Sequence, residues 1–510
     1  MLRADTIQPA QRRMITLSLM VAAILQTLDT TIANVALPKM QGPLSASQDQ
    51  MTWVLTSYII AAAVMTPFAG WLAGRIGRRP LILGSIAAFT ISSMLCGVAQ
   101  NLPEMVLFRF LQGLAGAALV PMSQAVLLDI NPVEKHGRAM SIWGQGVLIG
   151  PMLGPLLGGW LTDHYSWRFV FYINLPLGIL AFLGVAASLP RGGGKRSHFD
   201  FLGFAFLTLG IGALQLTLDR GPMQDWFESA EVWFEAVLSG LAFYLFWVHS
   251  ATSRQPFLRT ALFTDRNYIT GNAFIFIVGV VVYSTMSLLP SLLQGLMGYP
   301  VFQAGVLTAP RSIGMMAAMT LAGPLIGKID PRAMIGCGFG LAAFSLWQMT
   351  KIDLTMSGDL ILWSGILQGF GTGLVSVPMS TLSFASLAPD LRNEGSALFS
   401  LVRNIGSCIG ISLAQTLLMR NTQVVHASLA ENISSYNLAA RDPQLLHQLS
   451  TPAGLAAFNA ELTRQAAAVA YIDDFKLMLV LCVLALPLLL LVKPAKRKPE
   501  EELPEISVES

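Results

Sequence analysis

Charged residues are scarce in this sequence. Asp, Glu, Lys and Arg make up 12% of the 510 residues, whereas hydrophobic residues make up 54%. A soluble protein carries roughly a quarter charged residues, so this chain has too little polar surface to face water on every side. Most of its surface must therefore face lipid. The net charge of +3 is small and does not indicate nucleic acid as a partner.

Other absences exclude further classes of function. The four cysteines lie in apolar runs, where they are expected to be small packing residues without disulfides. None of the six histidines is central in an apolar run, so neither a haem nor a metal site is expected. The sequence G-x-x-x-x-G-K-[ST] does not occur, which excludes direct use of ATP. We therefore predict no cofactor, no metal and no enzymatic activity.

The sequence does contain a series of long apolar segments. The hydrocarbon core of a bilayer is about 30 Å thick and needs roughly 20 apolar residues at 1.5 Å rise each. A window of that length predicts about fourteen spans with mostly short loops, and hence an all-α membrane protein with consecutive helices antiparallel. The predicted spans are 14–36, 51–74, 80–100, 103–128, 138–162, 168–189, 200–219, 230–250, 268–290, 302–326, 332–350, 358–387, 396–419 and 472–492.

Lysine and arginine residues are concentrated in alternate loops. Arg12, Arg78 and Lys135 belong to loops rich in basic residues, while the loops between them are nearly bare. The positive-inside rule places both termini in the cytoplasm, in agreement with an even number of spans. The polar segment at about 420–470 is then a long outer loop, either disordered or a docking surface, and the acidic tail 496–510 is expected to be disordered.

The sequence also repeats itself. "AGWLAGRIGRR" at 69–79 matches "AGPLIGKIDPR" at 322–332, and "LQGLAGAALVP" at 111–121 recurs as "LQGFGTGLVSVP" at 367–378. Two parallel halves around a midplane site are an architecture of secondary transporters. We predict two pseudo-symmetric six-helix bundles, at 1–190 and 267–495, with a two-helix insertion at 191–266 between them.

Charged residues lie well inside several predicted spans, among them those that hold Asp29 and Arg109. A charge at a helix centre costs at least about 2.5–3.5 kcal/mol, so each needs a reason. Asp29 and Arg109 lie at similar depth and could pair. The carboxylate could exchange protons, because apolar surroundings favour its neutral form and a nearby cation favours its charged form. Either this exchange couples transport to protons, or the two residues form a permanent ion pair that only fixes two helices.

Other polar residues occupy the same spans. Arg311 lies inside the span 302–326, where it could contact substrate, act as a counter-ion or line a gate. Gln26, Gln112 and Gln368 lie on helices expected to line a central cavity, and we assign them with Arg311 to the substrate pathway. Arg403 lies nearer the cytoplasmic end of its span and is expected to have a gating or structural role.

Small residues recur at a helical interval in the fifth span. Its sequence "GQGVLIGPMLGPLLGGWL" places a glycine at every fourth residue, so that the glycines form one bare stripe, and its prolines add kinks. Such a stripe lets another helix approach closely, and we predict that it forms a seam between the two halves that resists leak. The motif comprises Gly146, Gly150, Pro151, Gly154, Pro155, Gly158 and Gly159.

A cytoplasmic gate is one interpretation of the loop "GWLAGRIGRRP" between the second and third spans. A pairing of Asp129 with Arg78 or Arg79 would close the gate and open as the halves rock, whereas the alternative is a topology signal of positive charge alone. The candidate gate residues are Gly70, Arg75, Gly77, Arg78, Arg79, Asp129 and Arg403.

Several of these motifs together resemble the major facilitator superfamily, specifically its fourteen-span drug:proton antiporters of the EmrB type. The matching stretches are "LDTTIANVALP", "GWLAGRIGRR", "RFLQGLAGA", "GPMLGPLLGGWL", "SWRFVFYINLPLG" and "LDRGPMQDWF". The stretch "GPMLGPLLGGWL" of the fifth span is the most specific, because it resembles the antiporter signature of exporters. In one departure, Gly74 and its repeat counterpart Gly327 stand where the superfamily usually carries an aspartate, so any latch there must use other residues.

The resemblance implies a proton-driven exporter of hydrophobic or amphipathic small molecules in the cell inner membrane. It also implies a periplasmic adaptor and an outer-membrane channel as partners of a tripartite pump. Two alternatives are an exporter of one metabolite or siderophore and, from another class, a non-transporting membrane receptor or a membrane enzyme.

Overall fold

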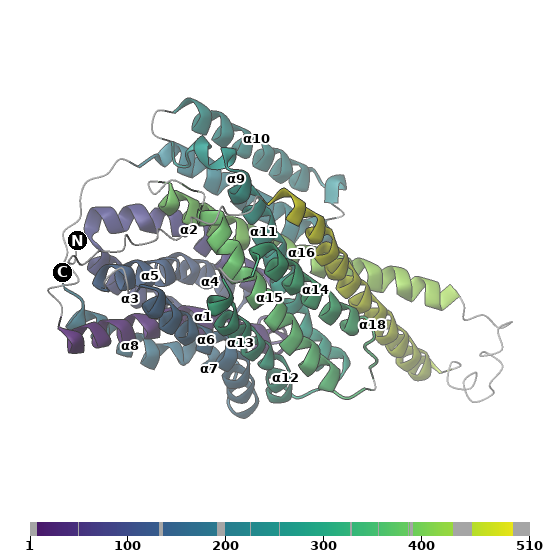
Figure 1. Cartoon of the computed structure of the whole chain (residues 1–510). Coiled ribbons are helices and arrows are strands. Elements are labelled where there is room, and N and C mark those ends of the chain that lie inside the picture. Colours follow the sequence, from purple (N-terminus) through teal and green to yellow (C-terminus); the bar gives the residue numbers. More distant parts are fainter. Residues whose placement is uncertain are drawn as a thin grey trace, which may run out of the picture.

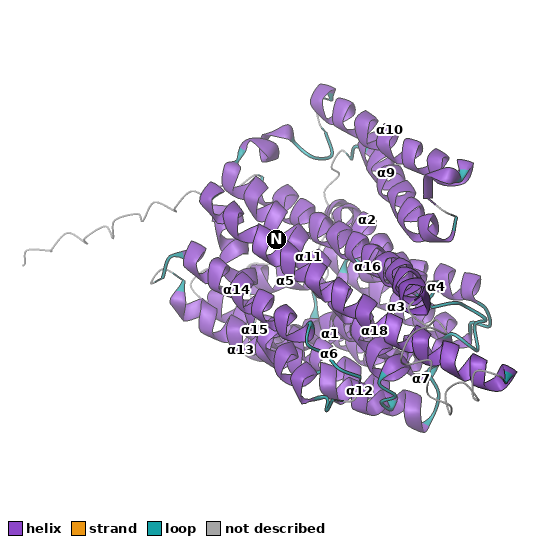
Figure 2. Cartoon of the chain, turned by 90° about the vertical axis from the view of Figure 1, so that its right-hand side faces the viewer, coloured by secondary structure: helices purple, strands orange, loops and turns teal. Residues whose placement is uncertain are grey.

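The computed structural model describes residues 8–48, 50–131, 136–190, 199–224, 226–253, 256–326, 329–354, 356–385, 387, 391–431 and 451–492. The acidic tail 496–510 and Gly327 lie outside these residues. The described part of the chain consists of long helices joined by short connections (Figures 1 and 2). The main helices are α1 (Pro9–Met40), α2 (Thr52–Ile76), α3 (Arg78–Val98), α4 (Leu102–Gly116), α5 (Leu119–Ile130), α6 (His136–His164), α7 (Phe169–Tyr172), α8 (Asn174–Ser188), α9 (Phe201–Arg220), α10 (Ala230–Thr252), α11 (Arg266–Ser291), α12 (Val301–Thr308), α13 (Pro310–Leu325), α14 (Pro331–Met349), α15 (Asp359–Ala385), α16 (Arg392–Glu431) and α18 (Pro452–Ala485).

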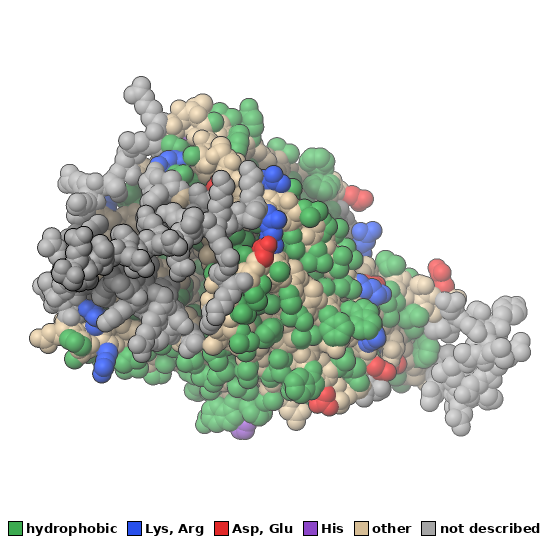
Figure 3. Space-filling model, viewed as in Figure 1, with side chains coloured by type: hydrophobic (Ala, Val, Ile, Leu, Met, Phe, Trp, Pro, Cys, Tyr) green, Lys and Arg blue, Asp and Glu red, His purple; other side chains and the backbone are tan. Residues whose placement is uncertain are grey.

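The predicted all-α membrane fold is confirmed. Within the described residues, eleven helical segments are long and apolar enough to cross a membrane, and they coincide with eleven of the predicted spans. The other predicted spans are also helices: 138–162 is α6, 302–326 is α12 with α13, and 332–350 is α14. Hydrophobic side chains cover much of the face seen in Figure 3, as a surface in contact with lipid requires.

The helix contacts of the first six spans recur in the last six. In the first set, which we call the first half, α1 packs on α6 and α8, and α4 packs on α2 and α3. In the second half, α11 packs on α16 and α18, and α15 packs on α13 and α14. The two halves meet along two seams, α6 with α12 and α13, and α2 with α16. The inserted helices α9 and α10 pack on each other, and α9 also contacts α2 and α16.

Two helices extend further than predicted. α16 continues to Glu431 and α18 begins at Pro452, so both enter the segment 420–470 that was expected to be a loop. In α18, the residues before the apolar run are rich in alanine, which is a strong helix former. Thr451 caps the first turn of α18 by accepting a hydrogen bond from the Gly454 amide at 3.1 Å. Figure 1 shows the two helices projecting side by side from the bundle.

We call the end of the bundle where α1 begins the near end, and the end where α1 stops the far end. Successive spans run in opposite directions, so α2 begins at the far end and α3 begins at the near end. At the near end, the Gln11 side chain of α1 donates to the Ser188 carbonyl of α8 at 3.2 Å.

Candidate functional site

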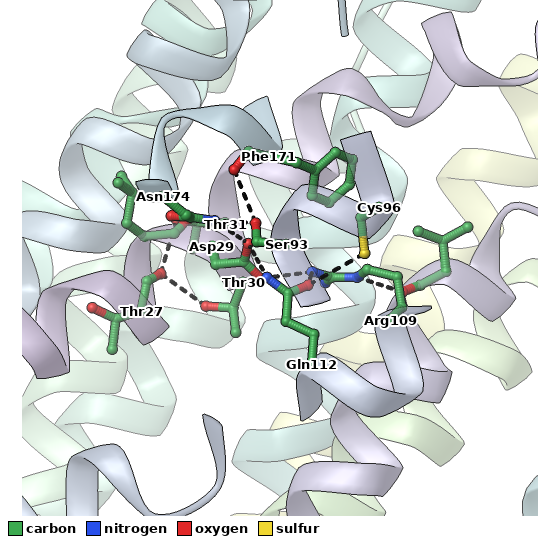
Figure 4. A network of polar contacts seen from close by, with 12 residues as sticks. Thr27, Asp29, Thr30, Thr31, Ser93, Cys96, Arg109, Gln112, Phe171 and Asn174 are labelled. Carbon is green, nitrogen blue, oxygen red and sulfur yellow. Dashed lines mark hydrogen bonds and ion pairs between the residues drawn. The ribbon is translucent and has the colours of Figure 1, made fainter. Parts of the chain in front are cut away.

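The predicted pair of intramembrane charges is formed. Arg109 Nη1 of α4 lies 2.6 Å from Asp29 Oδ2 of α1 (Figure 4), and the two side chains are only 1% and 0% exposed. Helix rise explains the meeting, because Asp29 lies about three turns before the far end of α1 and Arg109 about two turns from the far end of the antiparallel α4. The pair is therefore a buried charge neutralised by its partner, which is the form in which charges persist in apolar surroundings.

Neutral donors complete the shell of the carboxylate. Asn174 Nδ2 and Gln112 Nε2 both donate to Asp29 Oδ1, at 2.7 and 2.9 Å. The Gln112 side chain also accepts from Arg109 Nη1 at 2.8 Å, and so touches both members of the pair. An ionised carboxylate only accepts hydrogen bonds, and all three side chains around Asp29 present donors to it. The arrangement thus fits a charged aspartate in this state.

The Arg109 guanidinium also has contacts besides Asp29, with a backbone carbonyl and two aromatic rings. Arg109 Nε donates to the Val54 carbonyl of α2 at 3.1 Å. Its guanidinium carbon lies 4.4 Å from the centre of the Tyr58 ring and 5.8 Å from that of Phe171. Aromatic faces attract a cation through the negative face of the ring. The cation is therefore enclosed by α2, α4 and α7 and points toward α1.

Sequence reasoning missed three members of this site, namely Asn174, Ser93 and Tyr58. Asn174 Nδ2 also donates to Ser93 Oγ at 2.9 Å, and Ser93 Oγ donates to the Phe171 carbonyl at 2.9 Å. The available signal was weak: Asn174 is the one amide in the otherwise apolar stretch "YINLPLG", and serine and tyrosine are common in membrane helices. Buried amides in lipid need partners, so Asn174 could have been singled out but not assigned to Asp29.

A small cavity opens beside the pair, at the boundary of the two halves. It is lined by residues of α1, α2 and α4 from the first half and of α11 and α16 from the second, including Thr30, Asn34, Arg109, Tyr283 and Ile411. Arg109 thus lies both in the buried network and at the wall of this cavity. In the described residues, no group of three or more His, Cys, Asp or Glu side chains is placed to hold a metal ion.

The residues assigned to a substrate pathway occupy several places. Gln112 belongs to the charged network, whereas Gln26 accepts from the Val120 amide at 3.2 Å, at the break between α4 and α5. In the second half, Gln368 of α15 donates to Thr285 Oγ1 of α11 at 3.2 Å, and Arg311 Nη2 of α13 donates to the Val282 carbonyl at 3.2 Å. The predicted pathway is therefore divided between two sites, one in each half.

The glycine stripe of α6 is present, but its predicted partner was wrong. Gly150, Gly154 and Gly158 face α1, where a Cβ on Gly158 would lie 2.8 Å from the Ile32 carbonyl oxygen. Both helices belong to the first half, so the stripe packs this half internally and does not form a seam between halves. Four-residue spacing indicates close approach but carries no information about which helix approaches.

The seam between halves uses the next residues of the same motif. Gly159 faces the backbone of Phe302 in α12, and Gly305 of α12 faces the carbonyl of Pro155. Gly146 faces Met20 of α1, and Pro151 lies inside the helix with Pro155. The motif therefore has two contact surfaces, a long one against α1 and a short one against α12.

The candidate gate residues join helices of a single half. Arg78 pairs with Asp129, as predicted, but this links α3 to α5 within the first half. Arg79 instead donates to the Ala186 carbonyl of α8 at 2.5 Å. Both contacts are internal to the first half, so neither joins the halves across a gate. Among the remaining candidates, Gly70 and Arg403 are exposed.

The connection between α2 and α3 consists of one residue. Gly77 has a φ of 93°, a conformation that side chains disfavour, and its amide donates to the Ala73 carbonyl at 3.1 Å. Arg75, two residues earlier, is exposed, and its guanidinium lies 5.2 Å from the Trp71 ring centre. Glycine at 77 is thus required by the turn, which is a structural reason for its place in the loop motif.

Comparisons with known proteins agree with this architecture. The sequence profile described as Major Facilitator Superfamily matches residues 19–411. The chain is 34% identical over 435 residues to the multidrug export protein EmrB of Escherichia coli (strain K12), covering 84% of this chain and 85% of that protein. It is also 34% identical over 486 residues to the fatty acid resistance protein FarB of Neisseria gonorrhoeae, covering 94% and 96%.

A solved structure has the same fold. The crystal structure of a bacterial homolog of the human lysosomal transporter Spinster superposes with a TM-score of 0.60, at 17% identity, over 96% of this chain and 100% of that one. At that identity the likeness concerns the arrangement of helices alone.

Proposed function

Because the chain belongs to the major facilitator superfamily, we propose that it is an antiporter that exports drug-like hydrophobic or amphipathic molecules in exchange for protons. The names of its relatives support export of such compounds: EmrB is a multidrug export protein and FarB a fatty acid resistance protein. The single observation that carries proton coupling is the buried pair of Asp29 and Arg109, of which Arg109 lines a cavity between the halves.

Asp29 is the proposed proton carrier. When it is charged, Arg109 and the two amides satisfy it, and the pair is neutral as a whole. A proton on Asp29 leaves the guanidinium without its counter-charge, and removing one partner of a buried pair costs about 3–5 kcal/mol. Protonation thus raises the free energy of this arrangement relative to any other in which Arg109 finds a different partner. That difference is what couples proton binding to a change of conformation.

The two seams provide the motion. The halves contact each other through α6 with α12 and α13, and through α2 with α16, while α1 and α11 contact each other more lightly between these seams. Rocking about such seams exposes a central site to either face in turn. In this proposal the cavity beside Arg109 is the part of the central site that stays open to α11 and α16.

The test is transport by purified protein in liposomes with an imposed pH gradient. Asp29→Asn is expected to abolish substrate-dependent proton flux, because the amide cannot exchange a proton. Asp359→Asn is the matched control, since Asp359 is an exposed aspartate at the start of α15. Equal flux in the Asp29→Asn variant and the wild type would contradict the coupling role.

Substrate breadth separates the main proposal from its rival. A panel of chemically varied compounds, tested as growth inhibitors of a knockout strain, should show several hypersensitivities if the protein exports many drugs. A response to one metabolite or siderophore alone would favour a dedicated exporter. No substrate-dependent flux with any compound would favour a receptor or an enzyme.

We further propose that the near end faces the cytoplasm of a cell inner membrane and that the far end docks a periplasmic adaptor leading to an outer-membrane channel. The basic loops support the orientation, and the extensions of α16 and α18 at the far end support the docking. These extensions touch each other at His426 Nε2 and Asn459 Oδ1, 2.9 Å apart, and expose Val424 and Leu455. Removal of a tag by external protease tests the orientation.

A further inference from the structure

A second carboxylate lies at the junction of three helices, far from Asp29 in the sequence. Asp219 is the penultimate residue of the inserted helix α9. Its Oδ1 accepts from Ser412 Oγ of α16 at 2.6 Å and from Gln215 Nε2 of its own helix at 2.7 Å. Its Oδ2 accepts from Thr56 Oγ1 of α2 at 2.9 Å. One carboxylate therefore bonds to a helix of each half.

The two oxygens are divided between the halves. Oδ2 accepts from the first half through Thr56, while Oδ1 accepts from the second half through Ser412. Gln215 supports the second contact, since its Nε2 also lies 3.2 Å from Ser412 Oγ. Separation of α2 from α16 must therefore break at least one of these bonds, and α9 then moves with the half to which it stays bonded.

The carboxylate is held by neutral donors. The adjacent Arg220 turns to the other inserted helix, where it pairs with Glu231 and with Glu235, whose Oε1 lies 3.1 Å from Arg220 Nη1. Among the ion pairs formed by the described residues, none involves Asp219. If a carboxylate oxygen of Asp219 loses its hydroxyl donor, no cation replaces that donor, so the buried oxygen is left with an unsatisfied hydrogen bond.

The junction lies at the far end, where two direct hydrogen bonds between the halves also lie. Gln294 Nε2 donates to the Val35 carbonyl at 2.9 Å, and the Phe302 amide at the start of α12 donates to Asp163 Oδ2 of α6 at 2.7 Å. Both are direct hydrogen bonds between the halves. The structure is thus closed at the far end, with Asp219 on the α2–α16 seam and Asp163 on the α6–α12 seam.

We propose that Asp219 is the acceptor of a latch that keeps the far end closed, and that α9 is the strap that carries it. The inference rests on the proposed alternating access, because it assigns the inserted helix to one step of that cycle. Thr56 and Ser412 are the two donors of the latch, and opening of the far end requires release of at least one of them. Asp219 is a positioning residue, which acts on the halves and not on substrate.

Pulsed electron paramagnetic resonance tests the latch without any substrate. Spin labels at Tyr165 and Lys351, both exposed at the far end on opposite halves, report the opening of that end, in a background where the exposed Cys337 is replaced by serine. Asp219→Ala, Thr56→Val and Ser412→Ala are each expected to raise the far-end-open population about tenfold, which corresponds to about 1.4 kcal/mol. Thr56→Ser, which keeps the hydroxyl, is expected to behave as the wild type.

Thr217→Val is the matched control, because the Thr217 hydroxyl lies on the same helix but donates only to the Ala213 carbonyl, at 2.9 Å. Thr56→Val added to Asp219→Ala should have no further effect if both act through one bond. Distance distributions of the three latch variants that match that of Thr217→Val would overturn the proposal. If Asp219→Ala does not fold, the Thr56 and Ser412 variants decide alone.

The latch and the proposed function fail separately. Absence of transport in the wild type with every compound would contradict export, while the label distances would still report the latch. Unchanged distances together with normal transport would contradict the latch alone.

Discussion

Arg109 and Tyr58 form the tightest cation–π contact of the buried network, with the guanidinium carbon 4.4 Å from the ring centre. Tyr58 belongs to α2, the helix that also carries Thr56 to the Asp219 junction. The wall of the charged site and the α2–α16 seam are therefore parts of one helix, separated by half a turn. A displacement of α2 at the far end consequently reaches Arg109 directly.

This contact gives a first prediction. The Tyr58 hydroxyl makes no hydrogen bond with the described residues, so Tyr58→Phe should leave stability nearly unchanged. Tyr58→Leu removes the aromatic face and should lower the free energy of unfolding by about 1–2 kcal/mol. Thermal unfolding of the two variants in the same detergent checks it. Equal losses in both would mean that the hydroxyl, and not the ring, stabilises this site.

The ion pair should show strong non-additivity. Asp29→Leu and Arg109→Leu each leave an unpaired buried charge and should each cost about 3–5 kcal/mol. The double variant carries no buried charge at this site and should be more stable than either single variant. Measured stabilities that simply add would show that the two charges do not interact.

The glycine stripe predicts a contrast along α6. Gly158→Ala places a Cβ against the Ile32 carbonyl of α1, so the helices must move apart and stability should fall by about 1–3 kcal/mol. Gly144, on the same helix, has no atom within 4 Å of an added Cβ. Gly144→Ala should therefore be neutral or stabilising by up to about 1 kcal/mol. Similar melting temperatures for both variants would contradict the assigned packing.

Asp200 predicts a dependence on pH at the start of α9. Burial alone would raise the pKa of Asp200, but hydrogen bonds from the Gly203 amide, His249 and the Phe257 amide outweigh it, and its pKa is lowered. A carboxyl whose pKa is lowered by folding stabilises the protein above its unfolded-state pKa, and this stabilisation is lost as pH falls through the folded-state pKa.

The corresponding experiment compares Asp200→Asn with the wild type. The variant should be less stable by about 1 kcal/mol at neutral pH, since its uncharged amide has one acceptor oxygen and cannot satisfy the Gly203 amide, His249 and the Phe257 amide together. Below the ordinary carboxyl pKa of 3.8 the difference should shrink toward zero. If the stability difference between Asp200→Asn and the wild type stays constant with pH, the loss of stability comes from the shape of the side chain and not from its charge.

The pairing of Asp29 with Arg109 could be predicted from the sequence, because the depth of a residue in a membrane follows from counting residues along its helix. The distances of Asp29 and Arg109 from the ends of their apolar runs gave similar depths, and helix rise converts residues into depth without knowledge of neighbours. The helix count was predictable because it is read one span at a time, and the two-half repeat because one stretch of sequence matches another.

Partners across helices were not predictable in the same way. The stripe of Gly150, Gly154 and Gly158 indicated a close neighbour but not α1, and Asn174 gave no sign of its bond to Asp29. Asp219 lies beside Arg220, where an acidic residue at the end of a span reads as an ordinary interfacial charge. In each case the missing information was the rotation of a helix about its axis, which depends on packing against several other helices at once.

Gly77 is the single residue between α2 and α3, so their connection is too short to let one helix move without the other. A tilt of α2 at the seam with α16 must therefore also move the first turn of α3, where Arg78 forms an ion pair with Asp129. α2 and α3 are therefore expected to move together, with their shared turn among the basic residues of the near end. Any larger residue at 77 would be strained at this φ of 93°, so that a change at this one turn is expected to disturb how α2 and α3 move together.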